Sequence, residues 1–84
     1  MKVTVNVTRE HLANGQRNNN TRCAVALALK DAGVKFGWCG SFGIYPALHD
    51  YTAIAKWTAD ITEQIRRFDD GEMLEPFCFE LEVP

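Results

Sequence analysis

The sequence predicts an α+β fold, in which two helices pack on one face of a sheet of three to four mainly antiparallel strands. Three observations support this prediction. Apolar and polar residues alternate at both ends of the chain, residues 23–29 are wholly apolar, and residues 57–68 carry an apolar stripe at helical spacing. With shorter alternating segments between them, the order is β-α-β-β-α-β, and one sheet covered by two helices buries every apolar face.

Length and composition indicate one compact domain spanning residues 1–84. Of the 84 residues, 46% are hydrophobic and 24% are charged, which is ordinary for a globular protein. A chain of this length has no room for a second hydrophobic core.

Residues 2–8 are predicted to form the first strand, because their three valines share one face. Thr8 then acts as an N-cap, since its hydroxyl can accept from the backbone N–H near His11. The short helical turn that follows ends at the left-handed stop that Asn14 and Gly15 supply.

The most apolar stretch is the predicted helix 22–32. Its residues 23–29 are Cys-Ala-Val-Ala-Leu-Ala-Leu, and a helix this apolar must be covered on nearly all sides. We expect Thr21 to be its N-cap and Gly33 to end it. The helix therefore lies at the centre of the domain and holds the polar loop 16–21 at its N-terminal end.

The middle of the chain has weaker patterns. Residues 34–38 alternate and are predicted to form the second strand, and the glycines at 37, 40 and 43 indicate a bulge or a close backbone approach. Pro46 disfavours a central strand. Residues 51–57 fit a strand by alternation, or a helix by their alanines and the cap-like Asp50. The β-branched and aromatic residues at both ends favour the strand.

The C-terminal third shows two clear periodicities. Residues 58–70 are predicted to form the second helix, which Gly71 ends, and its stripe comprises Trp57, Ile61, Ile65 and Phe68. Residues 77–83 form the last strand, whose odd-numbered residues face the core. Its outward face carries alternating acids, which suit an exposed edge.

Composition and cysteine usage restrict the class of protein. The sequence has neither the roughly 20 apolar residues of a membrane helix nor the pattern of a signal peptide, so we expect a cytoplasmic protein without membrane contact. Three widely spaced cysteines argue against a disulfide framework and for a reducing compartment. With two histidines and no Cys-x-x-Cys, we expect no metal site and no cofactor.

Charge is distributed unevenly along the chain. The net charge is −2, but residues 1–68 hold all nine bases, whereas residues 69–84 hold six acids and no base. These acids are a candidate partner-binding edge that would occupy a basic groove on another protein. Alternatively, they serve solubility and protect the sheet edge. They are Asp69, Asp70, Glu72, Glu75, Glu80 and Glu82. A nucleic-acid-binding surface usually carries more bases, so we do not expect direct nucleic-acid binding.

The loop before the apolar helix is a candidate site for a small anion or nucleotide. Helix N-termini attract anions, arginine forks suit phosphate or carboxylate, and asparagine amides suit a base or sugar edge. The candidate ligands are Arg17, Asn19, Asn20 and Arg22. The simpler interpretation is a solvated loop whose asparagines satisfy turn geometry, since the glycine pattern of a phosphate loop is missing.

Cys23 is a candidate nucleophile. A cysteine in the first turn of a helix, beside Arg22, has its thiolate favoured, and His11 would serve as its base if it folded back. Alternatively, Cys23 continues the apolar run as a small buried residue. No residue is evident to orient the histidine, so we expect a protein that binds rather than catalyses, with no catalytic residue.

The glycine-rich segment 37–43 carries Trp38 and Phe42, and Tyr45 follows shortly after it. If exposed, these aromatic residues would anchor a partner protein. Packing in the core is the simpler interpretation, and a stacking platform for nucleobases is a third.

Four segments resemble small uncharacterised proteins encoded in bacteriophage and prophage genomes. They are Val-Thr-Val-Asn-Val-Thr-Arg-Glu-His-Leu-Ala-Asn-Gly at 3–15, Cys-Ala-Val-Ala-Leu-Ala-Leu-Lys at 23–30, Ile-Arg-Arg-Phe-Asp-Asp-Gly at 65–71 and Glu-Pro-Phe-Cys-Phe-Glu-Leu at 75–81. The resemblance covers both ends and skips residues 36–56, and this chain has Cys23-Ala24 where Cys-Pro would be expected.

The resembled proteins carry no known activity, so no catalytic residue is transferred. What the resemblance implies is a phage origin and the cytoplasm of a host cell. Phage proteins of this size are often accessory proteins that bind and inhibit or modulate a host protein complex, including CRISPR or restriction machinery. A monomer and a homodimer both fit these features.

Overall fold

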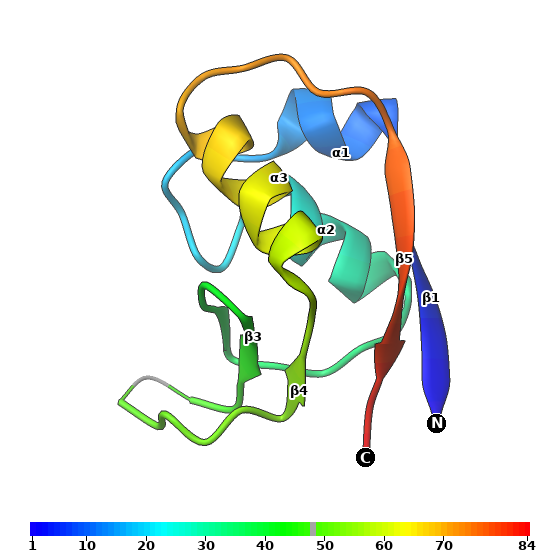
Figure 1. Ribbon diagram of the computed structural model, residues 1–84, viewed down its shortest axis with the longest axis vertical. Coiled ribbons are helices and arrows are strands. Elements are labelled where there is room, and N and C mark those ends of the chain that lie inside the picture. Colours follow the sequence, from blue (N-terminus) through cyan, green and yellow to red (C-terminus); the bar gives the residue numbers. More distant parts are fainter. Residues whose placement is uncertain (48) are drawn as a thin grey trace.

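The computed structural model describes residues 1–47 and 49–84, and it confirms the α+β class (Figure 1). Within these residues, three helices and five strands follow one another. In order they are β1 (Lys2–Val7), α1 (Arg9–Asn14), α2 (Ala24–Asp31), β2 (Trp38–Cys39), β3 (Gly43–Tyr45), β4 (Ala55–Lys56), α3 (Ala59–Asp69) and β5 (Phe77–Glu82).

The strands form two antiparallel sheets, whereas the sequence predicted one. β1 pairs with β5 from Lys2–Glu82 to Val7–Phe77, and β2, β3 and β4 form a separate sheet in that order. The middle strands are only two or three residues long. Pro46, which lacks an N–H donor, directly follows β3. The short sheet therefore contacts β5 through β4 without extending the β1–β5 ladder.

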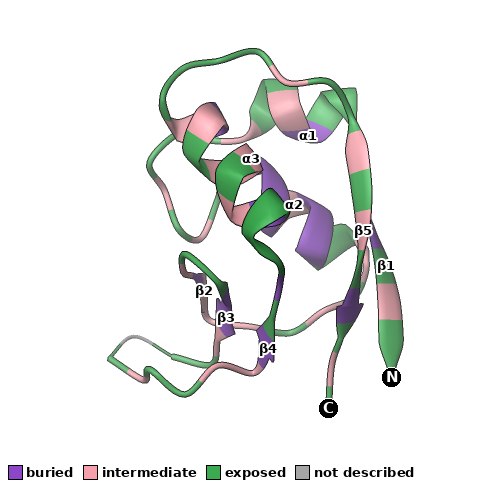
Figure 2. Ribbon diagram, in the orientation of Figure 1, coloured by how far each residue is buried: buried purple, intermediate pink, exposed green. Residues whose placement is uncertain are grey.

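Helix α2 lies at the centre of the molecule, as predicted. Figure 2 shows most of its ribbon as buried, and it contacts α1, α3 and β1. Its buried residues are Ala24, Val25, Ala26, Ala28 and Leu29. Its N-cap, however, is Cys23 and not Thr21, because the Thr21 N–H and hydroxyl both donate to the side chain of Asn19. The helix therefore begins later than the sequence predicted.

The predicted N-cap of α1 is confirmed, whereas the predicted left-handed stop at its C-terminus is wrong. Thr8 and His11 form a reciprocal capping box, since each side chain accepts from the other residue's backbone N–H. Gly15, in contrast, is not a left-handed stop, because its φ is −66°. Glycine is needed there for space: a Cβ would lie 2.5 Å from the Ala24 nitrogen, at the start of α2. Gly33, with φ of +82°, provides the left-handed turn after α2.

The middle of the chain is less regular than predicted. Residues 34–37 form no strand, and β2 begins only at Trp38. Within 51–57 only Ala55–Lys56 is a strand and no helix forms, so the preference for strand holds for these two residues. The glycines mark close approaches, because a Cβ on Gly43 would clash with the carbonyl of Ala55 in β4.

The C-terminal elements agree with their predicted positions. Helix α3 begins after Thr58 and ends before Gly71, whose φ is +96°. Along β5, half-buried or buried residues alternate with exposed ones. The chain end returns to its start, where the Met1 amino group donates to the Val83 carbonyl, and Figure 1 shows both termini beside the β1–β5 ladder.

Candidate functional site

An open cleft of about 870 Å³ lies where the polar loop before α2, the β2–β3 hairpin and α3 meet. The cleft unites residues from three separately predicted features: loop asparagines, hairpin aromatics and the first of the C-terminal acids. Its lining consists of Asn18, Asn19, Asn20, Cys23, Trp38, Cys39, Gly40, Ser41, Phe42, Tyr45, Ile65 and Asp69.

One wall of the cleft is aromatic. The rings of Trp38 and Tyr45 are stacked with centroids 4.3 Å apart and planes 16° apart, and Tyr51 meets Trp38 edge-on at 6.0 Å. Phe42 is 57% exposed. Of the three interpretations from the sequence, core packing is wrong for Phe42, and Trp38 and Tyr45 are only half-buried.

Glycine and hydrogen bonds hold this wall in place. A Cβ on Gly40 would clash with the ring of Tyr45, so the stack depends on a residue without a side chain. The Trp38 indole N–H donates to the Ala47 carbonyl at 2.7 Å. The carbonyl of Ser41 accepts from both Trp57 Nε1 and the Thr62 hydroxyl, which ties the hairpin turn to α3.

The opposite wall is a tightly bonded polar loop. Asn19 Oδ1 accepts from the N–H groups of Thr21 and Arg22, and the asparagine side chain thus closes its own turn. Asn18 has a left-handed φ of +57°, and its N–H donates to Asp69 Oδ1 at 2.8 Å. The carbonyl of Asn20 accepts from the Cys39 N–H at 2.7 Å. These bonds agree with the simpler interpretation, in which the asparagines satisfy turn geometry.

The two arginines of the proposed anion site do not join the asparagines in the cleft. Arg17 lies over the ring of Phe68, with its guanidinium carbon 4.4 Å from the ring centroid, and donates to the carbonyls of Phe68 and Glu72. Those carbonyls lie at and just beyond the C-terminus of α3, where a cation is favoured. Arg22 is exposed and does not line the cleft. Of the four candidate ligands, Asn19 and Asn20 therefore line the cleft, whereas Arg17 and Arg22 do not.

Two buried cysteines from distant parts of the chain line the cleft together. Cys23 is 3% exposed and Cys39 is 7% exposed. A hydrogen bond from Cys39 lowers the pKa of Cys23 to about 7, against the opposing effect of burial. The N–H groups of Ala26 and Val25 add to the lowering, and the charge of Asp69 opposes it. The same hydrogen bond and burial raise the pKa of Cys39.

His11, the base considered for Cys23, is engaged elsewhere. Its Nδ1 accepts from the Thr8 N–H at 3.0 Å, which leaves the proton on Nε2. Nε2 lies 2.5 Å from Asp31 Oδ2 and donates to that carboxylate. His11 thus links α1 to the end of α2, and the cysteine's hydrogen-bonding partner is Cys39 instead.

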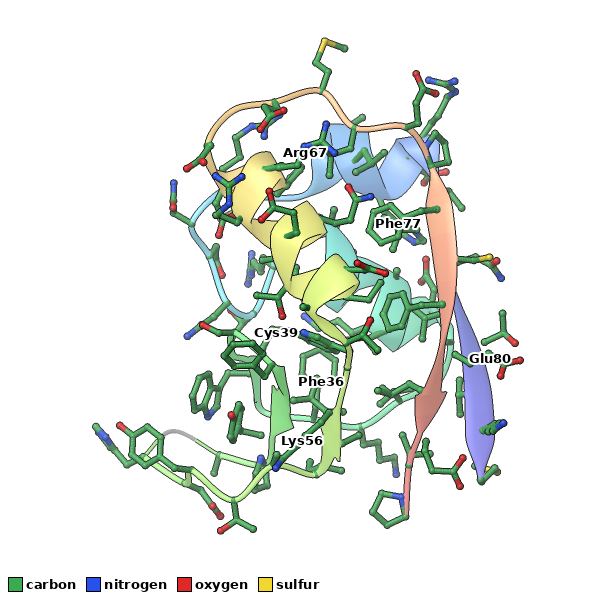
Figure 3. All side chains as sticks on the ribbon, viewed as in Figure 1. Phe36, Cys39, Lys56, Arg67, Phe77 and Glu80 are labelled. Carbon is green, nitrogen blue, oxygen red and sulfur yellow. The ribbon has the colours of Figure 1, made fainter. Side chains whose placement is uncertain are left out.

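The C-terminal acids are dispersed and mostly paired with cations. The ion pairs are Asp70–Arg66 at 2.5 Å, Glu72–Arg67 at 3.1 Å, Glu75–Arg9 at 3.1 Å, Glu80–Lys2 at 3.9 Å and Glu82 with the Met1 amino group at 3.1 Å. Figure 3 labels Glu80 beside β5, well away from Arg67, the partner of Glu72. The acids thus form no continuous unpaired edge, and Asp69 alone among them lines the cleft.

Comparison with protein-family models, with curated proteins and with solved structures gave no match. Within the described residues, no helix has the length and apolar character needed to span a bilayer. Across residues 1–47 and 49–84, histidines, cysteines and acids form no group of three that could hold a metal ion.

Cys39 is one of the cleft residues that the sequence did not identify as a candidate, as are Gly40, Ser41 and Ile65. Its position between Trp38 and Gly40, in a segment where glycines allow backbones to approach closely, is the signal that could have drawn attention to it. Figure 3 labels Cys39 between α3 and the small sheet.

Proposed function

We propose that this protein acts by binding another protein, with the cleft as its contact surface. The observation that carries the proposal is the Trp38–Tyr45 stack beside exposed Phe42. Trp and Tyr are enriched among the residues that dominate binding energies at protein interfaces, because they bury large rigid surfaces with a polar end. A pre-formed wall also loses little conformational entropy when a partner binds.

The polar side of the cleft complements this wall. Polar residues Asn18, Asn19 and Asn20 border the apolar part of the cleft, as a polar rim borders the apolar centre of a protein interface. The loop is fixed by Arg17 and Asp69, so its groups keep their positions when the partner is absent.

The kind of partner is proposed from the resemblance alone. Small phage proteins often inhibit or redirect a host complex, so a host protein complex, such as CRISPR or restriction machinery, is the partner we propose. The acidic residues have a lesser role in this proposal than the sequence suggested, because ion pairs neutralise most of them.

The alternative function, capture of a small anion or nucleotide, has less support. It needs arginine forks facing the asparagines, and Arg17 is instead bonded to the end of α3. Calorimetry with a nucleotide panel tests it: binding that Arg22→Ala abolishes would favour this alternative over a protein partner.

The binding proposal is tested by affinity capture with matched variants. Phe42→Ala removes an exposed aromatic residue of the cleft, and Met73→Ala removes an apolar residue that is 94% exposed and outside it. We expect wild type and Met73→Ala to retain the same stoichiometric partner from a host lysate, and Phe42→Ala to bind it about ten-fold more weakly. The proposal fails if wild type retains no such partner or if both variants bind it equally well.

A further inference from the structure

Two cysteines from different elements meet at the base of the cleft. Cys23 is the N-cap of α2, and Cys39 is the last residue of β2. The backbone bond from Cys39 to Asn20 fixes the strand beside the loop that leads into the helix. Both residues thereby line the same cleft, where a hydrogen bond from Cys39 lowers the pKa of the Cys23 thiol. Both thiols are free, and both line an open cleft.

The surroundings of Cys23 favour its thiolate. Its Sγ accepts from the Ala26 N–H at 3.4 Å, at the positive end of the α2 dipole. The negative charge of Asp69 on α3 raises the pKa of Cys23. The positive charge of Lys30 on α2 lowers the pKa of Cys39. The net result is a Cys23 sulfur that favours the thiolate and a Cys39 sulfur that keeps its proton, both at the base of one cleft.

We propose that Cys23 and Cys39 form a peroxide-oxidisable pair, in which Cys23 reacts first and Cys39 resolves the product to a disulfide. An activated thiolate beside a second thiol is the arrangement that permits reversible oxidation. The oxidant we propose is hydrogen peroxide, which is small enough to enter the cleft that both cysteines line. This proposal does not depend on the proposed binding function.

The chemistry proceeds in two balanced steps. The Cys23 thiolate attacks one oxygen of hydrogen peroxide, the O–O bond breaks, and hydroxide leaves and is protonated to water, which gives a sulfenic acid. The Cys39 sulfur then attacks Cys23 Sγ, the S–S bond forms and the S–O bond breaks. Hydroxide leaves with the proton of Cys39 as a second water. The two thiols have lost two electrons, and peroxide has gained them.

The disulfide would join the N-terminus of α2 to the hairpin that carries the aromatic wall. Residues 23 and 39 belong to segments that only hydrogen bonds and packing hold together in the reduced protein. Oxidation would therefore fix the base of the cleft covalently.

The test uses the full chain with Cys78→Ser, which removes the exposed third thiol. The folded protein is treated with hydrogen peroxide at pH 7, beside free cysteine as a reference, and analysed by intact mass and peptide mapping. We expect a loss of two hydrogen atoms and a linked pair of peptides containing Cys23 and Cys39. The proposal is overturned if both thiols stay reduced under conditions that fully oxidise free cysteine.

Two substitutions at one position separate the roles of the sulfurs. Cys39→Ser keeps a hydrogen-bond donor but removes the resolving sulfur, so Cys23 should oxidise at a similar rate and stop at a sulfenic acid that dimedone traps. Cys39→Ala removes both the hydrogen-bond donor and the resolving sulfur. The oxidation of Cys23 by peroxide should then slow by roughly ten-fold, because the thiolate fraction of Cys23 falls. Equal rates in the two variants, with native circular dichroism spectra, would contradict the role given to Cys39.

Discussion

The guanidinium group of Arg17 packs against the ring of Phe68 and donates a hydrogen bond to the carbonyl of the same residue. One side chain thereby fixes the polar loop to the C-terminus of α3. The contact joins residues 51 positions apart in the chain and sets the position of the wall that faces the aromatic stack.

Replacement of Arg17 by alanine should lower the free energy of unfolding by about 1–2 kcal/mol, because a cation–π contact and charged hydrogen bonds to carbonyls are lost together. Urea denaturation followed by circular dichroism measures the change. Arg22→Ala is the matched control, since Arg22 is an exposed arginine of the same loop. A similar loss of stability in both variants would show that the Arg17 contact adds nothing specific.

Two glycines should respond differently to substitution, because each is required for a different reason. Gly15→Ala places a Cβ 2.5 Å from the Ala24 nitrogen, so the start of α2 must move, at a cost of about 1–3 kcal/mol. At Gly33, with φ of +82°, an added Cβ meets no atom within 4 Å, and the cost of about 1 kcal/mol is conformational. Thermal or urea denaturation measures both changes.

Asparagine at the same two positions provides the control. Asparagine tolerates the left-handed region, so Gly33→Asn should recover part of the stability that Gly33→Ala loses. No such recovery is expected from Gly15→Asn, where the obstacle is space. Recovery at both positions would contradict the steric explanation for Gly15.

The long elements at both ends were predictable because each repeats its pattern over several turns or residue pairs. The alternation of β1 and β5 and the stripe of α3 gave bounds close to those observed. Strands β2 and β4 have two residues each, which is too short for any periodicity. Their existence depends on pairing with β3, so local sequence could not define them.

The candidate site was predictable in its parts but not in its assembly. Asn19, Trp38 and Phe42 were each singled out from local sequence, and the structure brings them to one cleft. The capture of Arg17 by Phe68 and the meeting of Cys23 with Cys39 are tertiary contacts, and nothing in the local sequence encodes them.

Glu63 and Arg66 provide a test of surface electrostatics. Arg66 lies one helical turn after Glu63, and its hydrogen bonds lower the pKa of that carboxyl. A carboxyl whose pKa is lower in the folded state stabilises the fold above its unfolded pKa, and this contribution is lost as pH falls through the folded value. Since Glu63 is solvent-exposed, the effect should be small and should disappear in high salt.

The measurement compares wild type with Glu63→Gln across pH 2–7 by urea denaturation. We expect the difference in stability between the two proteins to be present at neutral pH and to vanish at the acid end. A difference that persists at the lowest pH would mean that Glu63 stabilises the helix by something other than its charge.

The reactivity of Cys23 should follow a pH profile set by its neighbours. In the Cys78→Ser background, the rate of alkylation should rise with pH and level off above about 7, the pKa to which the hydrogen bond from Cys39 lowers that of Cys23. An ordinary thiol reaches its plateau only above about 8.5. Asp69 opposes ionisation of Cys23, so Asp69→Asn, which keeps the oxygen that accepts from Asn18, should move the midpoint to lower pH. Cys39→Ala should move it to higher pH. A profile that neither substitution shifts would show that these neighbours do not control the thiolate.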